Sequence, residues 1–157
     1  MAKKKKQHYV NNKDFLAAMI IFRDAVIEEK AKDGPRPRVP HYVGECLMKI
    51  AVHLSHKPNF SGYTYKEDMI SDGIENCLQY IDNFNPEKSS NPFAYFTQII
   101  YYAFLRRIAK EKKVLYIKLK YTEESFIMNT NNSTQEGDTT DYSPPGKVSE
   151  WSNEYVD

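Results

Sequence analysis

Apolar side chains recur at helical spacing through the first 121 residues, where glycine is scarce. Breaks in the pattern separate four such stretches. The first begins after Asn11 or Asn12 and runs to about Lys32, the second opens at Pro40, the third opens at Thr64, and the fourth runs from Asn91 to near Lys113. The pattern therefore predicts an all-α fold, a compact domain of about four main helices over residues 9–121.

Each expected helix has one apolar face, which we expect to form the core. In chain order these faces are Phe15, Met19, Phe22 and Val26; Val43, Leu47, Ile50 and Leu54; Ile70, Ile74, Cys77, Leu78 and Ile81; and Phe93, Phe96, Ile100, Ala103 and Ile108. Two helix starts are also marked. Thr64 and Glu67 have the spacing of a capping box, and Asn91 is a candidate cap with Pro92 at the first helical position.

The sequence changes character after the fourth helix. Residues 114–121 fit a strand, because their side chains alternate, and they fit a continuing helix equally well. The next stretch is rich in Asn, Ser, Thr, Asp and Gly, which predicts a disordered linker over residues 122–147. Residues 148–157 regain apolar side chains among acidic ones, a composition typical of a short docking motif.

The net charge of +1 conceals a strong asymmetry along the chain. Residues 1–121 carry 21 basic and 13 acidic side chains, whereas residues 122–157 carry one basic and eight acidic side chains. A lysine-rich stretch at residues 1–8 predicts a basic amino-terminal arm. A basic body is typical of a protein that meets nucleic acid, and an acidic tail is not.

Several classes of protein are excluded at this point. No apolar run approaches the ~20 residues of a transmembrane helix, and the lysine run at 3–6 is not followed by the apolar segment of a secretory signal. Cys46 and Cys77 lie in apolar helical patterns, which favours reduced thiols in a cytoplasmic setting. His53 and His56 with Cys46 invite a zinc interpretation, but their spacing matches no standard finger, so surface histidines are favoured. We expect no membrane contact, no metal and no cofactor.

Three carboxylates share the polar face of the expected third helix. Asp68, Asp72 and Glu75 lie at i, i+4 and i+7. A solvated acidic face, a docking face for a basic partner helix and a metal site all fit this pattern. The metal site fits least well, because no histidine or second acidic helix is at hand in the sequence.

Aromatic and basic side chains combine on the expected fourth helix. Tyr95, Gln98, Tyr102 and Arg106 lie on one face, with Tyr101 and Leu105 on its flank. Exposed tyrosines beside arginine suit unpaired bases, because a ring offers a stacking surface and a guanidinium neutralises phosphate. Residues 106–121 carry seven basic side chains and one acidic side chain, which extends this basic character. The alternative is that the tyrosines cover a neighbouring helix and the lysines only solubilise.

These two helices carry a family resemblance. Residues 68–74 (DMISDGI), 81–84 (IDNF), 92–97 (PFAYFT) and 106–108 (RRI) resemble region two, the core helical domain, of bacterial sigma factors. Three segments are more closely similar to the late-transcription sigma factors of T-even-type bacteriophages: residues 9–13 (YVNNK), 59–64 (NFSGYT) and 69–75 (MISDGIE). The resemblance covers residues 9–113.

The resemblance implies two partners. The acidic helix of the family docks on a coiled coil in the largest subunit of the host core RNA polymerase, which assigns Asp68, Ser71, Asp72 and Glu75 to polymerase binding. The aromatic helix of the family opens the −10 promoter element and captures a flipped base of the non-template strand. The corresponding DNA-binding residues here are Tyr95, Gln98, Tyr101, Tyr102, Leu105, Arg106, Arg107, Lys110 and Lys113.

Two departures from the family pattern affect these expectations. The housekeeping members have a Trp-Trp pair where this chain has Gln98 and Ile99, so the pocket for the flipped base must differ. No second helix-turn-helix domain fits after residue 121. Phage late sigma factors instead bind a sliding clamp through a hydrophobic, acidic carboxy-terminal motif, and the matching cluster here is Trp151, Tyr155 and Val156. A co-activator is a further possible partner.

The sequence thus predicts a phage late sigma factor that joins host polymerase and opens a −10-like late promoter in the bacterial host cytoplasm or nucleoid. We do not expect an enzyme, because there is no glycine-rich phosphate loop and no arranged nucleophile and base. Two alternatives stay open. One is a polymerase-binding regulator that does not read DNA, and the other is a carboxylate-metal enzyme that uses Asp68, Asp72 and Glu75.

Overall fold

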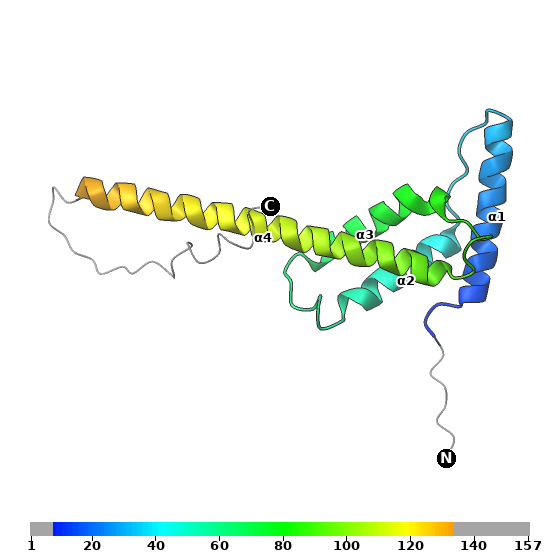
Figure 1. The fold of residues 1–157 in the computed structure, drawn as a ribbon, viewed down its shortest axis with the longest axis horizontal. Coiled ribbons are helices and arrows are strands. Elements are labelled where there is room, and N and C mark those ends of the chain that lie inside the picture. The colour runs from blue at the N-terminus through cyan, green and yellow to red at the C-terminus, as the bar shows by residue number, and fades with distance from the viewer. Residues whose placement is uncertain (1–7, 134–157) are drawn as a thin grey trace, which may run out of the picture. The chain divides into compact units, whose positions relative to one another are not determined.

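The fold is all-α, as predicted. The computed structural model describes residues 8–133 and contains no β-strand among them. Its elements, labelled in Figure 1, are α1 (Asn12–Ala31), α2 (His41–Ser55), α3 (Lys66–Tyr80), the short 3₁₀ helix η1 (Ile81–Asn83) and α4 (Pro92–Ser133). None of the helices described is both long enough and apolar enough to cross a lipid bilayer.

The chain divides into two units, Met1–Arg107 and Ile108–Asp157, and the boundary between them falls within α4. The described part of the first unit contains α1, α2, α3, η1 and the residues of α4 up to Arg107. The described part of the second unit is the remaining helical segment, residues 108–133. The predicted domain ended later, at residue 121.

Asparagine side chains cap the starts of α1 and α4, and one of them also links the two helices. The Asn11 carboxamide oxygen accepts a hydrogen bond from the backbone N–H of Lys13 (3.1 Å), and that of Asn91 accepts one from Ala94 (3.0 Å), which confirms the predicted cap at Asn91. Asn12 accepts a hydrogen bond from the backbone N–H of Phe93 (3.2 Å). Figure 1 shows the consequence, which is that α1 lies across the ends of the other helices of this unit.

The core of the first unit is largely the predicted one. Every residue of the expected apolar faces of the first two helices is buried, and so are Phe96, Ile100 and Ala103 in α4. Ile108, the first residue of the second unit, is buried as well. Phe93 is only partly buried, and the core also takes in Phe60, Phe84 and Phe104. Both cysteines are buried free thiols, and burial raises the pKa of Cys77 to about 12.

The buried face of α3 differs from the predicted one. Met69, Gly73, Cys77 and Ile81 are buried, whereas Leu78 is 39% exposed. The reason is Gly73, because a β-carbon there would lie 3.0 Å from a methyl carbon of Ile100 and 3.2 Å from the Phe104 ring. Without a side chain, the backbone of α3 contacts α4 directly, so the line of contact runs through Gly73 rather than through the larger apolar residues beside it.

The capping box expected at the start of α3 is not formed. The helix begins at Lys66, after Tyr65, and no side chain caps its first turn. Thr64 and Glu67 therefore do not stand in cap and third-residue positions. Two acidic residues in the first turn, Glu67 and Asp68, still stabilise the helix through their favourable interaction with the positive end of its dipole.

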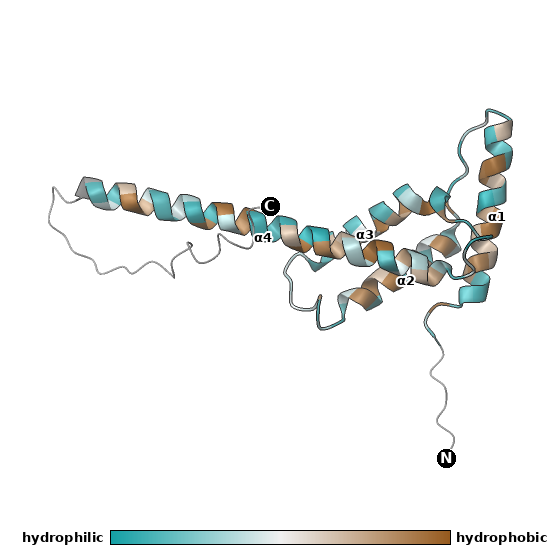
Figure 2. Ribbon diagram, viewed as in Figure 1, coloured by the Kyte–Doolittle hydropathy of each residue, from teal (hydrophilic) through white to brown (hydrophobic). Residues whose placement is uncertain are grey.

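The fourth helix is much longer than predicted. It does not end near Lys113, the ambiguous segment 114–121 is helical, and the helix continues through residues 122–133, where a disordered linker was expected. The side-chain hydroxyls of Thr122, Ser125 and Thr130 each donate to a backbone carbonyl four residues earlier, which accommodates them inside the helix. Polar and apolar residues alternate around this part of α4 (Figure 2). The other residues of the predicted linker, the docking motif and residues 1–7 of the basic arm lie outside the described residues.

The close approach at Gly73 predicts a stability difference between two helical glycines. In G73A the new methyl group must displace two fully buried neighbours, so we expect the free energy of unfolding to fall by about 1–2 kcal/mol. In G44A nothing lies within 4 Å of the new methyl group, and the gain in helix propensity should raise stability by about 0.5–1 kcal/mol. Urea unfolding of both variants measures this difference, and equal stabilisation of the two would contradict the packing described here.

Candidate functional site

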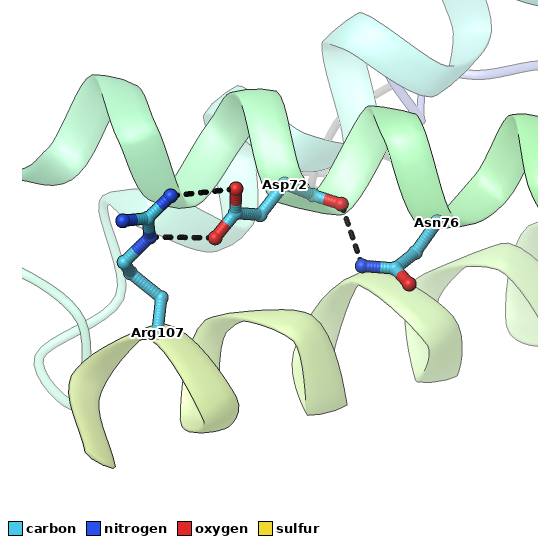
Figure 3. A network of polar contacts seen from close by, with 3 residues as sticks. All are labelled: Asp72, Asn76 and Arg107. Carbon is cyan, nitrogen blue, oxygen red and sulfur yellow. Dashed lines mark hydrogen bonds and ion pairs between the residues drawn. The ribbon is translucent and has the colours of Figure 1, made fainter. Parts of the chain in front are cut away.

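An ion pair joins α3 to α4 in the first unit. Arg107 donates to both carboxylate oxygens of Asp72, from Nε at 2.6 Å and from a terminal nitrogen at 2.8 Å (Figure 3). The side chain of Arg107 is 18% exposed and that of Asp72 is 28% exposed. Asn76 donates to the backbone carbonyl of Asp72 (2.8 Å). A two-point, partly buried pair of this kind fixes geometry as well as charge.

This pair joins two residues for which the sequence predicted different partners. The sequence assigned Asp72 to polymerase binding and Arg107 to DNA, but each side chain faces the other across the α3–α4 contact. Asp72 also does not lie on a face opposite the core, because it borders the contact made by Gly73. No periodicity in the sequence signals a pair that is 35 positions apart.

The other predicted polymerase-binding residues lie on the surface of α3. Asp68, Ser71 and Glu75 are all exposed. They follow one another at i, i+3 and i+7, so they share one face of the helix. We refer to these three residues as the acidic face of α3.

Five predicted DNA-binding residues form an exposed surface on the part of α4 in the first unit. They are Gln98, Tyr101, Tyr102, Leu105 and Arg106, which we call the aromatic face of α4. Tyr102 is 50% exposed. Tyr101 packs edge-to-face against the buried Phe60 (5.4 Å between ring centroids) and against Tyr102 (5.7 Å), so its ring is held in place.

The part of α4 that carries the aromatic face contains no acidic residue. Arg106 is exposed within it, and the chain has no acidic residue between Glu87 and Glu111. A surface that combines phenol rings, an amide and a guanidinium without a nearby carboxylate in sequence can stack on bases and contact phosphates. Lys110 and Lys113 are also exposed, but they belong to the second unit.

Tyr95 does not lie on this surface. Its ring packs against Phe84 (5.3 Å) and Phe96 (5.0 Å), and its hydroxyl donates to the backbone carbonyl of Tyr80 (3.1 Å). Burial raises the pKa of this phenol, and the nearby Cys77 adds to the effect. The sequence did not reveal these contacts, because helical periodicity does not show that the segment after α3 folds against the first turn of α4.

Phe60 is the supporting residue that the sequence did not reveal. It lies between Asn59 and Ser61 in a segment that reads as a loop, yet it is buried and contacts Tyr101 and Phe104. The only available signal was an apolar aromatic residue isolated among turn-forming residues.

The described residues do not form a metal centre. Within 8–133, no group of three or more His, Cys, Asp or Glu side chains is placed to hold an ion. His53 stacks on Tyr9, with 3.8 Å between ring centroids, and its Nδ1 is 2.8 Å from the Lys49 carbonyl. The acidic face of α3 therefore stands as a set of separate surface charges.

Comparison with known proteins gives no match, either to a protein-family model or to a curated protein.

The partly buried position of the Asp72–Arg107 pair predicts a measurable coupling. A double-mutant cycle with Asp72→Ala and Arg107→Ala should give a coupling energy of about 1–2 kcal/mol in the free energy of unfolding. The more exposed Arg36–Asp82 pair (3.1 Å) is the matched control, and its cycle should give at most about 0.5 kcal/mol. Equal coupling in the two cycles would mean that the Asp72–Arg107 pair contributes no more than a surface contact.

Proposed function

We propose that this protein is a sigma-type initiation factor for phage late transcription, which joins host core RNA polymerase and opens a −10-like promoter element. The observation that carries this proposal is the aromatic face of α4, where Tyr101, Tyr102 and Arg106 lie on one surface without a carboxylate nearby in sequence. The resemblance to sigma region two supplies the partner and the step.

The energies involved are of the right size for strand separation. Unstacking and flipping a base costs a few kcal/mol, and each base stacked on an aromatic side chain returns ~1–3 kcal/mol. Two exposed rings beside a guanidinium can therefore offset the cost of capturing an unpaired base of the non-template strand. Tyr101 is the better-positioned ring, because its contact with Phe60 holds it before DNA arrives.

Polymerase binding is best assigned to the acidic face of α3, namely Asp68, Ser71 and Glu75. These side chains are exposed and can meet a basic coiled coil. We assign Asp72 a different role, which is to hold α4 against α3 through Arg107. With Gly73 at the same contact, docking of α3 on polymerase would fix the position of the aromatic face of α4 as well.

Further partners follow from the sequence alone. The carboxy-terminal cluster of Trp151, Tyr155 and Val156 is proposed to bind a sliding clamp, with a co-activator as a further partner. The protein would then act in the host cytoplasm or nucleoid, with the chemistry supplied by polymerase.

A second candidate is a polymerase-binding regulator that does not read DNA. One observation favours it, because Tyr95 and Arg107, two of the residues assigned to DNA, contact other parts of the fold instead. The two candidates differ in whether the aromatic face of α4 contacts the non-template strand.

The DNA-reading function is tested by run-off transcription from an A·T-rich late promoter with core polymerase. The wild-type chain should confer promoter-specific initiation, and Tyr102→Ala should lower open-complex formation about tenfold or more, because a stacking surface worth ~1–3 kcal/mol is lost. Tyr80→Ala, which removes an exposed ring from α3, is the matched control and should be neutral.

Photo-crosslinking separates the two candidates directly. A crosslinker at position 102 should react with the non-template strand in the open complex. Crosslinks to polymerase only, with transcription unaffected by Tyr102→Ala, would instead support the regulator.

The polymerase-docking assignment is tested by charge reversal. Asp68→Lys should reduce binding to core polymerase at least tenfold, because it places a cation on a face that meets a basic partner. Glu67→Lys changes the same charge on the adjacent, exposed position and should bind nearly as wild type. Affinity is measured by a fluorescence titration with core polymerase, and normal binding by Asp68→Lys would remove α3 from the interface. Asp72 is unsuitable for this test because its loss would disturb the fold.

A further inference from the structure

The helical segment of the second unit has a face that combines lysines with exposed apolar side chains. Val114, Ile117 and Tyr121 lie at i, i+3 and i+7 and are 38%, 55% and 73% exposed. Four exposed lysines surround this apolar row on the same side of the helix: Lys110, Lys113, Lys118 and Lys120. We call these seven residues the basic–apolar face.

The chemistry of this face defines its occupant. Phosphates would satisfy the lysines, but they offer nothing to the apolar row. A second copy of the same helix would satisfy the apolar row, but it would bring like charges together, since residues 106–121 hold seven basic side chains and one acidic side chain. The occupant that satisfies both is a short peptide with apolar side chains among carboxylates.

The chain carries such a peptide at its own carboxy terminus. Residues 148–157 include the apolar Trp151, Tyr155 and Val156 and three acidic residues, and they contain no lysine or arginine. We propose that residues 148–157 dock on the basic–apolar face of α4 within the same chain. While docked, residues 148–157 and the lysines of the face are both inaccessible to other molecules. A partner that binds either of them would release the other.

The connecting length suits an intrachain contact. Ile117 lies 16 residues before Ser133 in α4, a span of about 24 Å along a helix. A flexible linker of 18 residues, which is the separation of Ser133 and Trp151 in the sequence, has a root-mean-square end-to-end distance of about 25 Å. Because the two lengths match, the effective concentration of the tail at this face is near its maximum, in the millimolar range for a short flexible linker.

The consequence for function rests on the proposed function. Lys110 and Lys113 are among the residues assigned to DNA, so a docked tail would compete with DNA for them. A protein that binds the tail, as proposed for the clamp, would release these lysines at the promoter. The docking itself requires neither partner.

Trp151 is the only tryptophan of the chain, so its fluorescence reports on the tail directly. In the full-length protein we expect acrylamide to quench Trp151 two- to threefold less effectively than in the free peptide 148–157. Ile117→Ser should raise quenching to the level of the peptide, and so should about 1 M NaCl, where the screening length falls to ~3 Å. Quenching in the full chain equal to that of the peptide would overturn the proposal.

Matched variants distinguish binding to this face from non-specific hydrophobic or electrostatic association. Leu119 is also apolar but lies on the opposite side of the helix, so Leu119→Ser should leave Trp151 protected. Lys113→Glu should expose Trp151, whereas Lys112→Glu, on the far side, should not. Equal effects of the two members of either pair would overturn the assignment of the face, and circular dichroism would verify that each helix is intact.

Two further measurements identify the occupant. Protection that rises with protein concentration, together with a dimeric mass in light scattering, would show that a second copy covers the face and would overturn the intrachain contact. Addition of promoter DNA should expose Trp151. If DNA binds without exposing Trp151, Lys110 and Lys113 are not DNA contacts, and that part of the proposed function fails while the docking stands.

Discussion

The close approach of α3 and α4 at Gly73 is the constraint on which the first unit depends. A β-carbon at this position would lie 3.0 Å from Ile100 and 3.2 Å from Phe104, both fully buried, so any larger residue would require these side chains to shift. Close packing of this kind allows little adjustment, because core side chains already fill the available space. The relative placement of the two proposed binding surfaces, one on each helix, therefore follows from a missing side chain.

The ion pair between Asp72 and Arg107 restricts how α3 and α4 can slide and rotate against each other. Apolar packing at Gly73 resists separation of the helices but constrains sliding and rotation less strongly, whereas a two-point ion pair accepts only a narrow range of positions. The pair removes one carboxylate and one guanidinium from the surfaces that the sequence assigned to partners. What is left exposed is more segregated, with acidic residues and a serine on α3 and aromatic rings with Arg106 on α4.

The sequence predicted α1 and α2 well because one regular apolar face of each helix meets the core, so every expected residue from Phe15 to Leu54 is buried. The prediction was wrong for α3. Leu78 is more hydrophobic than Gly73 and was therefore expected in the core, but Gly73 is buried at the contact with α4 and Leu78 is exposed. The aromatic face of α4 was also predicted from helical spacing alone, because its residues recur on one side of a single helix. The contacts of Tyr95 and Arg107 were not predicted because their partners, Tyr80 and Asp72, are distant in sequence, and helical periodicity carries no information about such pairs.

The length of α4 raises a separate physical question. Residues 122–133 are mostly polar, and an isolated helix of this composition gains little from intrinsic propensity, because most helical stability in proteins comes from packing of an apolar face. The second unit has such faces, with Ile117, Tyr121 and Met128 exposed by 55%, 73% and 71%. Order in this segment is therefore expected to increase when those side chains are covered. Lysines flank Ile117 and Tyr121, whereas residues 122–157 carry eight acidic side chains and one basic side chain. Opposite charge therefore favours binding of the carboxy-terminal residues to these apolar side chains.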